Sequence, residues 1–187
     1  VSGGTVTGKA SGTSVIKATY NGYTGSETVT VNDVLTYGLE LSVTSATISV
    51  GNTKTIAANY ITFTNGTRTS SKTVTSSASW SSSNPAVASV SGGSVTAKAT
   101  GSATITATYN GYSATATVTV EDDITYDYQL SPTSASVVNG RTTKMTIVRR
   151  TFTNGSQTNG EDYSSNFTWT SSNTSVATVG SNGVITG

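Results

Sequence analysis

The sequence contains no cysteine and no histidine, and only 10% of its 187 residues are charged. Without cysteine there are no disulfides and no thiol chemistry. Without histidine, an active site would need a carboxylate pair or a serine–lysine pair. The only acidic clusters are Glu121-Asp122-Asp123 with Asp127, and Glu161-Asp162, and nothing in the pattern places either in a cleft. We therefore predict that the chain is not an enzyme and has no cofactor.

Net charge and long apolar runs are also lacking. The formal net charge is +1, which gives no electrostatic basis for binding nucleic acid or an anionic membrane surface. The longest apolar runs are far shorter than a membrane span, so we expect no membrane insertion in this segment.

Serine and threonine are abundant, with 30 Ser and 39 Thr among the 187 residues. They alternate with apolar residues on both sides of Asn110-Gly111, a dipeptide typical of a two-residue β-hairpin turn. Pairing outward from this turn places Tyr109 opposite Tyr112, Ala107 opposite Ala114, Ile105 opposite Ala116 and Ala103 opposite Val118. The pattern predicts an antiparallel sheet with one apolar and one hydroxylated face.

The chain repeats itself with a period of 89 residues. Trp80 recurs as Trp169, Tyr20-Asn21-Gly22-Tyr23 as residues 109–112, and Phe63-Thr64-Asn65-Gly66 as residues 152–155. Residues 1–98 align with residues 90–187 without a gap. Short runs with turn signals every 8–12 residues predict that each unit is an all-β sandwich.

The period divides the chain into three parts. Residues 1–33 correspond to the last strands of one unit, 34–122 to a complete unit, and 123–187 to the first strands of a third. The joints contain no Gly/Pro-rich spacer, which favours a semi-rigid rod. We expect either a segment of a longer array, or completion of residues 123–187 by residues 9–34 of another copy. The expected partners are thus neighbouring units of the array or copies of the same chain.

Two polar segments differ most between the repeats, Thr64–Ala78 and Thr153–Phe167, and we interpret them as candidate recognition loops. Their polar candidates are Asn65, Arg68, Lys72, Asn154, Gln157, Glu161 and Asp162. Core positions are predicted at Trp80, Trp169, Ile105 and Val118; sugar stacking is the alternative for the tryptophans. The tyrosines beside the hairpin turns are expected to cover the end of the core or contact the next unit, with glycan binding as the alternative.

Two charged groups carry further hypotheses. Glu121, Asp122, Asp123 and Asp127 lie at a joint, where oxygen ligands could bind Ca²⁺, but the equivalent joint lacks this set; a solvated junction is the other interpretation. Arg149-Arg150 aligns with Tyr60-Ile61, which suggests an edge strand with one exposed and one stem-packed arginine.

The chain resembles the group 2 bacterial immunoglobulin-like domain family. The resemblance lies in Trp80-Ser81-Ser82-Ser83-Asn84, Val87–Val90, Gly93–Ala97 and Gly101–Ala107, and again in Trp169–Asn173 and Val176–Val179. It covers nearly the whole chain and implies an all-β fold of tandem immunoglobulin-like β-sandwiches of the Greek-key type, one for each 89-residue repeat, with neighbouring Ig-like units as partners and no catalytic residues to carry over. The family occurs in bacterial adhesins, surface-layer proteins, accessory modules of secreted enzymes and phage virions.

We therefore expect a non-enzymatic structural or adhesive module, extracellular, on a bacterial surface or phage particle, forming an extended rod or fibre. The alternatives are a carbohydrate-binding module, or an accessory domain of a larger secreted enzyme. Possible partners include a cell-surface glycan or protein.

Overall fold

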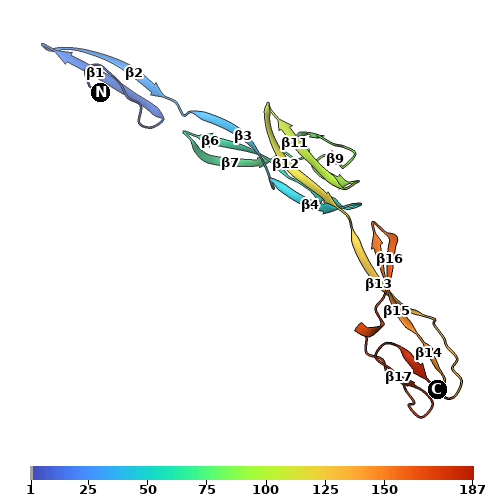
Figure 1. Cartoon of the computed structure of the whole chain (residues 1–187). Helices are drawn as coiled ribbons and strands as arrows, with labels where there is room; N and C mark the ends of the chain where they lie inside the picture. Colours follow the sequence, from blue (N-terminus) through green and yellow to red (C-terminus); the bar gives the residue numbers. More distant parts are fainter. Residues whose placement is uncertain (1) are drawn as a thin grey trace.

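The computed structural model describes residues 2–187, and its regular elements there are β-strands apart from one 3₁₀ turn, which confirms the all-β prediction. The three parts follow one another along an extended molecule, with the termini at opposite ends (Figure 1). No helix within residues 2–187 has the length and apolarity needed to cross a bilayer.

The first part is a two-stranded hairpin made of β1 (Gly12–Tyr20) and β2 (Tyr23–Val31). Its turn is Asn21-Gly22, with φ of 47° and 82°, as a type I′ turn requires. Among the residues described, the one backbone pairing before this hairpin is the isolated β-bridge between Ser2 and Thr5.

The second part is a complete two-layer sandwich. One layer is a four-stranded sheet in the order β4-β12-β11-β8, and the other consists of the sheets β3-β6-β7 and β5-β10-β9. The strands are β3 (Leu35–Leu41), β4 (Ser45–Ser49), β5 (Thr53–Thr55), β6 (Ala58–Thr64), β7 (Thr67–Thr73), β8 (Ser79–Ser82), β9 (Ala88–Ser91), β10 (Ser94–Ala97), β11 (Gly101–Tyr109) and β12 (Tyr112–Glu121).

The β11–β12 hairpin has the predicted register, from Tyr109 opposite Tyr112 to Gly101 opposite Val120. The interpretation of Thr64–Ala78 as a loop was wrong for its middle part, because residues 67–73 form strand β7, paired with β6. Every residue of β7 is exposed, so the strand lacks the apolar alternation by which sequence reasoning recognises strands.

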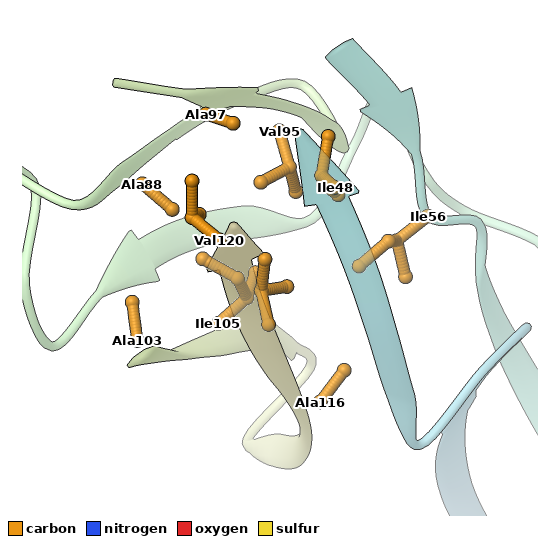
Figure 2. Packing of buried hydrophobic residues seen from close by; sticks show 10 residues of the cluster. Ile48, Ile56, Ala88, Val95, Ala97, Ala103, Ile105, Ala116 and Val120 are labelled. Carbon is orange, nitrogen blue, oxygen red and sulfur yellow. The ribbon is translucent and has the colours of Figure 1, made fainter. Parts of the chain in front are cut away.

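The core of the second part lies between the two layers. Ile105, Val118, Val95 and Ile56 are completely buried in one cluster, seen from close by in Figure 2. A smaller cluster contains Ala58, Val74 and Ala107. The half-buried Trp80 packs against both clusters and so joins the two ends of the core.

The Trp80 ring is held at a crowded corner. Its indole N–H donates a hydrogen bond to the Thr75 carbonyl oxygen at 2.9 Å. Gly93, with φ of 84°, passes so close that a Cβ atom there would lie 2.6 Å from Ile56 O and 3.2 Å from Trp80 Cζ2. In the third part, Trp169 donates in the same way to Ser164 O, at 2.9 Å.

The third part repeats the first strands of this sandwich. It contains β13 (Ile124–Ser131), β14 (Thr142–Lys144), β15 (Thr146–Thr153), β16 (Ser156–Asp162), a 3₁₀ turn η1 (Ser164–Asn166), β17 (Thr178–Val179) and β18 (Val184–Thr186). Residues 156–162 of the second candidate loop, Thr153–Phe167, are thus strand β16, which corrects that interpretation as well.

The gap-free alignment of the repeats was also wrong near the C-terminus. Val90 pairs with Val95 in the second part, whereas the equivalent Val179 pairs with Ile185. The second spacing is one residue longer, so the turn between β17 and β18 contains an inserted residue. The two turns are both rich in glycine and serine, and their similarity conceals the insertion at the level of sequence.

We predict that Gly93→Ala destabilises the second part far more than Gly111→Ala. Both glycines have φ near 80°, which costs an alanine about 1–2 kcal/mol. Only Gly93 also has close neighbours, adding about 1–3 kcal/mol of overpacking. Urea unfolding followed by tryptophan fluorescence measures both losses. Equal losses would contradict the assigned crowding.

Candidate functional site

The joint between the second and third parts is fastened by Asn154, the first residue of the β15–β16 turn. Its Nδ2 donates to Asp122 Oδ1 at 2.7 Å, and its Oδ1 accepts from the Asp123 backbone N–H at 2.8 Å. Its own backbone N–H donates to Asp123 O at 2.8 Å. Both residues between β12 and β13 are therefore bound to the next unit.

The first joint has the same arrangement, one period earlier. Asn65 Nδ2 donates to Asp33 Oδ1 at 2.8 Å, the Val34 N–H donates to Asn65 Oδ1 at 2.9 Å, and the Asn65 N–H donates to Val34 O at 2.8 Å. We call this set of three hydrogen bonds the joint clamp. Asn65 and Asn154 both have φ of 52°, a conformation that asparagine tolerates and that directs the side chain back to the joint.

The joint clamp is the feature that sequence reasoning missed. Asn65 and Asn154 were identified as recognition candidates, and Asp122 and Asp123 as calcium candidates, but their contact was not anticipated. A signal was present, since Asp33 and Asp122 stand one period apart, as do the two asparagines.

The structure does not bring the four calcium candidates together. Asp122 accepts a hydrogen bond from Asn154, while Asp127 pairs with Arg150. Within residues 2–187 no group of three or more acidic side chains is placed to hold a metal ion. Asp122 therefore stabilises the joint and Asp127 the third part's sheet, and the two carboxylates do not form a common site.

The remaining recognition candidates lie on exposed strands. Arg68 on β7 pairs with Glu40 at 3.0 Å, and Glu161 on β16 pairs with Arg149 at 2.7 Å. Asp162 pairs with Lys144 at 2.7 Å. Lys72 and Gln157 lie exposed on β7 and β16. Two surface strands, rather than two free loops, therefore carry these side chains.

The expectation that Arg149 and Arg150 lie on an edge strand was wrong, because their strand β15 is central in the sheet β13-β15-β16. Successive side chains of a strand alternate between the two faces of the sheet, so the two arginines point to opposite faces. Arg150 Nε donates to Asp127 Oδ1 at 2.7 Å on one face. On the other, the Arg149 guanidinium lies 5.0 Å from the Tyr126 ring centre and 4.3 Å from that of Tyr163.

The hairpin-tip tyrosines of the second part pack within their own unit. Tyr60 stacks on Tyr37 with ring centres 5.5 Å apart, and Tyr109 and Tyr112 meet its ring edge-on at 5.3 and 5.9 Å. Burial of this ring raises the pKa of Tyr60. The tyrosines thus cover the end of the core.

The outward face of the β4-β12-β11-β8 sheet is a continuous array of hydroxyl groups, which we call the hydroxyl face. Apart from Glu121 at the end of β12, its outward positions are all serine or threonine. They are Ser45, Thr47, Ser49, Ser79, Ser81, Ser102, Thr104, Thr106, Thr108, Ser113, Thr115, Thr117 and Thr119. Neighbouring hydroxyls repeat about every 6.8 Å along a strand and about 4.8 Å across strands.

Asp162 gives a pH-dependent prediction. The ion pair with Lys144, followed by hydrogen bonds from the Ser164 hydroxyl and backbone N–H, holds the pKa of Asp162 well below its usual range. The ionised Asp162 carboxylate therefore contributes to the free energy of unfolding above about pH 4, and this contribution is lost as the pH falls below that value towards the folded-state pKa. We expect Lys144→Gln to raise this pKa towards the ordinary value, as measured by carboxyl ¹³C NMR titration. An unchanged pKa would show that Lys144 does not hold Asp162.

Comparison with known proteins gives two kinds of relative. The chain is 33% identical over 98% of its length to ice-binding protein 1 of Shewanella frigidimarina, of which it spans 20%. Two solved structures of the surface layer protein SbsC are 21% and 20% identical over 82% of the chain, with TM-scores of 0.41 and 0.40. The chain spans 21% of each of these structures.

The match to a domain family is more direct. The family model of the bacterial Ig-like domain, group 2, matches residues 40–120 and again residues 126–187. These ranges lie within the second and third parts of the chain, and they cover most of the sandwich and both tryptophan corners. The chain therefore belongs to the group 2 bacterial Ig-like domain family, as a tandem array of its units.

Proposed function

We propose that the chain is a non-enzymatic spacer segment of an extracellular bacterial protein, in which successive Ig-like units form a semi-rigid rod. The joint clamp is the observation that carries this proposal. It occurs at both joints with the same donors and acceptors, at distances of 2.7–2.9 Å.

The joints leave little chain free to bend. Strand β2 ends at Val31 and β3 begins at Leu35, while β12 ends at Glu121 and β13 begins at Ile124. The clamp binds Asp33 and Val34 at the first joint, and Asp122 and Asp123 at the second. Only Asn32 remains outside it, so each unit continues into the next with restricted rotation.

The ice-binding relative supports a bacterial rather than a viral location. It is a protein of Shewanella frigidimarina, and the chain spans 20% of it. A spacer in a larger bacterial protein fits this proportion. An accessory domain of a secreted enzyme would use the same mechanical property.

Loss of the joint clamp should allow larger changes in the angle between neighbouring units. Asn65→Asp and Asn154→Asp keep the turn geometry, but each replaces an N–H donor with a carboxylate facing Asp33 or Asp122. We expect a wider distribution of inter-unit angles, measured by residual dipolar couplings and small-angle X-ray scattering.

The matched control is Asn21→Asp, at the same turn position but outside either joint, with φ of 47°. It should leave the inter-unit couplings unchanged. A double variant at residues 65 and 154 that keeps the wild-type couplings would refute the role of the clamp in stiffening the joints.

Glycan binding is less well supported. A binding module should expose an aromatic pair near β6 and β7, and Tyr37 and Tyr60 do stack there. However, Tyr60 is covered by Tyr109 and Tyr112, which leaves mainly the Tyr37 ring accessible, at 39% exposure.

A second candidate function is direct contact with ice through the hydroxyl face. It is favoured by the regular, almost uncharged array of hydroxyl groups on that face, and by the ice-binding relative. Hydroxyls both donate and accept hydrogen bonds, as a water lattice requires.

This candidate predicts thermal hysteresis for the isolated chain. Thr106→Tyr with Thr115→Tyr, a cross-strand pair on the hydroxyl face, should abolish it. Lys17→Tyr with Ser26→Tyr, the equivalent pair on the first hairpin, should not. No hysteresis in the wild-type chain would exclude ice contact and leave the spacer function intact.

A further inference from the structure

Each joint clamp is built on an asparagine that is followed by glycine. Asn65-Gly66 and Asn154-Gly155 are the turns of the β6–β7 and β15–β16 hairpins, with φ of 52° at both asparagines and 81° and 80° at the glycines. In this dipeptide the backbone nitrogen of the second residue attacks the side-chain amide readily, because glycine has no side chain to obstruct the approach. The residue that fastens each joint is therefore also chemically labile.

The reaction at this dipeptide requires only water. The Gly66 nitrogen attacks Cγ of Asn65, so that an N–Cγ bond forms and the Cγ–Nδ2 bond breaks. The proton of the Gly66 N–H leaves with Nδ2 as ammonia, and a five-membered succinimide ring remains. Water then opens this ring at one of its two carbonyl groups. The product is either an aspartate or an isoaspartate, in which the main chain runs through the side-chain carbonyl carbon.

The clamp restrains the amide group that would react. Nδ2 of Asn65 donates to Asp33 Oδ1 at 2.8 Å, and Oδ1 accepts from the Val34 N–H at 2.9 Å, so both polar atoms of the amide are bound to the joint. The Asn154 amide is bound in the same way, at 2.7 and 2.8 Å. Closure of the succinimide ring requires the side chain to rotate towards the next backbone nitrogen, which breaks both hydrogen bonds. The reaction therefore proceeds from molecules in which the joint has opened.

The second part provides a reference that is not clamped. Asn110-Gly111 forms the turn of the β11–β12 hairpin, with φ of 48° and 80°, and takes no part in either clamp. Its amide lies beside the Tyr60 side chain of the same unit instead. Asn65, Asn110 and Asn154 are all exposed to solvent. The three sites thus share a dipeptide, a backbone conformation and access to water, and they differ in whether the amide is bound between two units.

We propose that Asn65 and Asn154 are modification sites that deamidate when their joint opens, so that an opened joint is prevented from closing again. The new carboxylate faces that of Asp33 or Asp122 and has no N–H to donate, so repulsion replaces a hydrogen bond. An isoaspartate also lengthens the main chain of a two-residue turn, whose geometry sets the pairing of the flanking strands. The loss of stiffness rests on the proposed function of the clamp, whereas the dependence of the reaction on joint opening does not.

The two joints convert independently, because each clamp has its own residues. Asn65 is bound to Asp33 at the first joint, and Asn154 to Asp122 at the second. Each conversion adds one negative charge to a chain whose formal net charge is +1, so the net charge falls to −1 when both joints have converted. Chains with no, one or two converted joints therefore separate by ion exchange.

The test is peptide mapping by mass spectrometry during incubation of the full 187-residue chain in mildly alkaline buffer. Asp33→Ala removes the acceptor of the Asn65 Nδ2 and should accelerate conversion at Asn65 about tenfold, as expected for loss of a hydrogen bond to a charged group. Asp122→Ala should have the same effect at Asn154.

Two controls accompany these variants. Conversion at Asn110 should keep its wild-type rate in both, which also excludes general unfolding as the cause of any acceleration. Asn32→Ala, beside the first clamp but outside it, should leave all three rates unchanged. A rate at Asn65 in Asp33→Ala, or at Asn154 in Asp122→Ala, that is unchanged or lower overturns the proposal at that joint.

The converted chain separates this reaction from the proposed function. Chains converted at both joints, isolated by ion exchange, should show the wider distribution of inter-unit angles expected of Asn65→Asp with Asn154→Asp. Accelerated conversion in the variants together with wild-type couplings in the converted chain would refute the stiffening role of the clamp, and with it the loss of stiffness, while supporting the dependence of the reaction on joint opening. Unaccelerated conversion together with wider angles would overturn that dependence and support the proposed function.

Discussion

The cross-strand ladder between β11 and β12 is the interaction on which each complete unit depends. This hairpin supplies the pairing partner for β4 on one side and for β8 on the other, and its inner face covers both core clusters. Residues 123–187 contain the equivalents of β3, β5, β6, β7, β9 and β10 but not this hairpin, and there the equivalents of β4 and β8 are not strands. Strand formation in those two segments is thus a consequence of tertiary pairing rather than of local sequence.

The contacts around Trp80, the tryptophan corner, hold the layer of the sheets β3-β6-β7 and β5-β10-β9 against this hairpin. Trp80 lies on β8, directly beside Ala107 of β11, and its indole N–H is satisfied by Thr75 after β7. The close passage of Gly93 brings the β9–β10 turn against the same ring. One side chain therefore fixes the four-stranded sheet against both sheets of the opposite layer. The third part repeats this corner around Trp169, whose indole N–H is satisfied in the same way by Ser164.

Sequence reasoning succeeded where the apolar alternation was strong and failed where it was absent. The register of residues 101–120 followed from the Asn110-Gly111 turn and the strict alternation around it. Strands β7 and β16 were taken for loops because they are exposed on both faces and lack a period-two pattern. Arg149 and Arg150 were placed on an edge because two charges suggest solvent, but Asp127 and the tyrosine rings compensate them on a central strand. The joint clamp connects side chains 32 residues apart, a pairing that no local signal specifies.

The parallel pairing of β4 with β12 has a mechanical consequence. In the proposed rod, tension would enter the second unit at the start of β3 and leave it through the end of β12. Strand β4 follows β3 at the end of the unit where the tension enters, and it runs parallel to β12. The force is therefore directed along these two strands and loads the hydrogen bonds between them in shear. Hydrogen bonds loaded in shear must yield together, whereas those of an antiparallel hairpin pulled from its open end yield one after another. A single parallel ladder thus makes the unit strong in the one direction in which a tether is pulled.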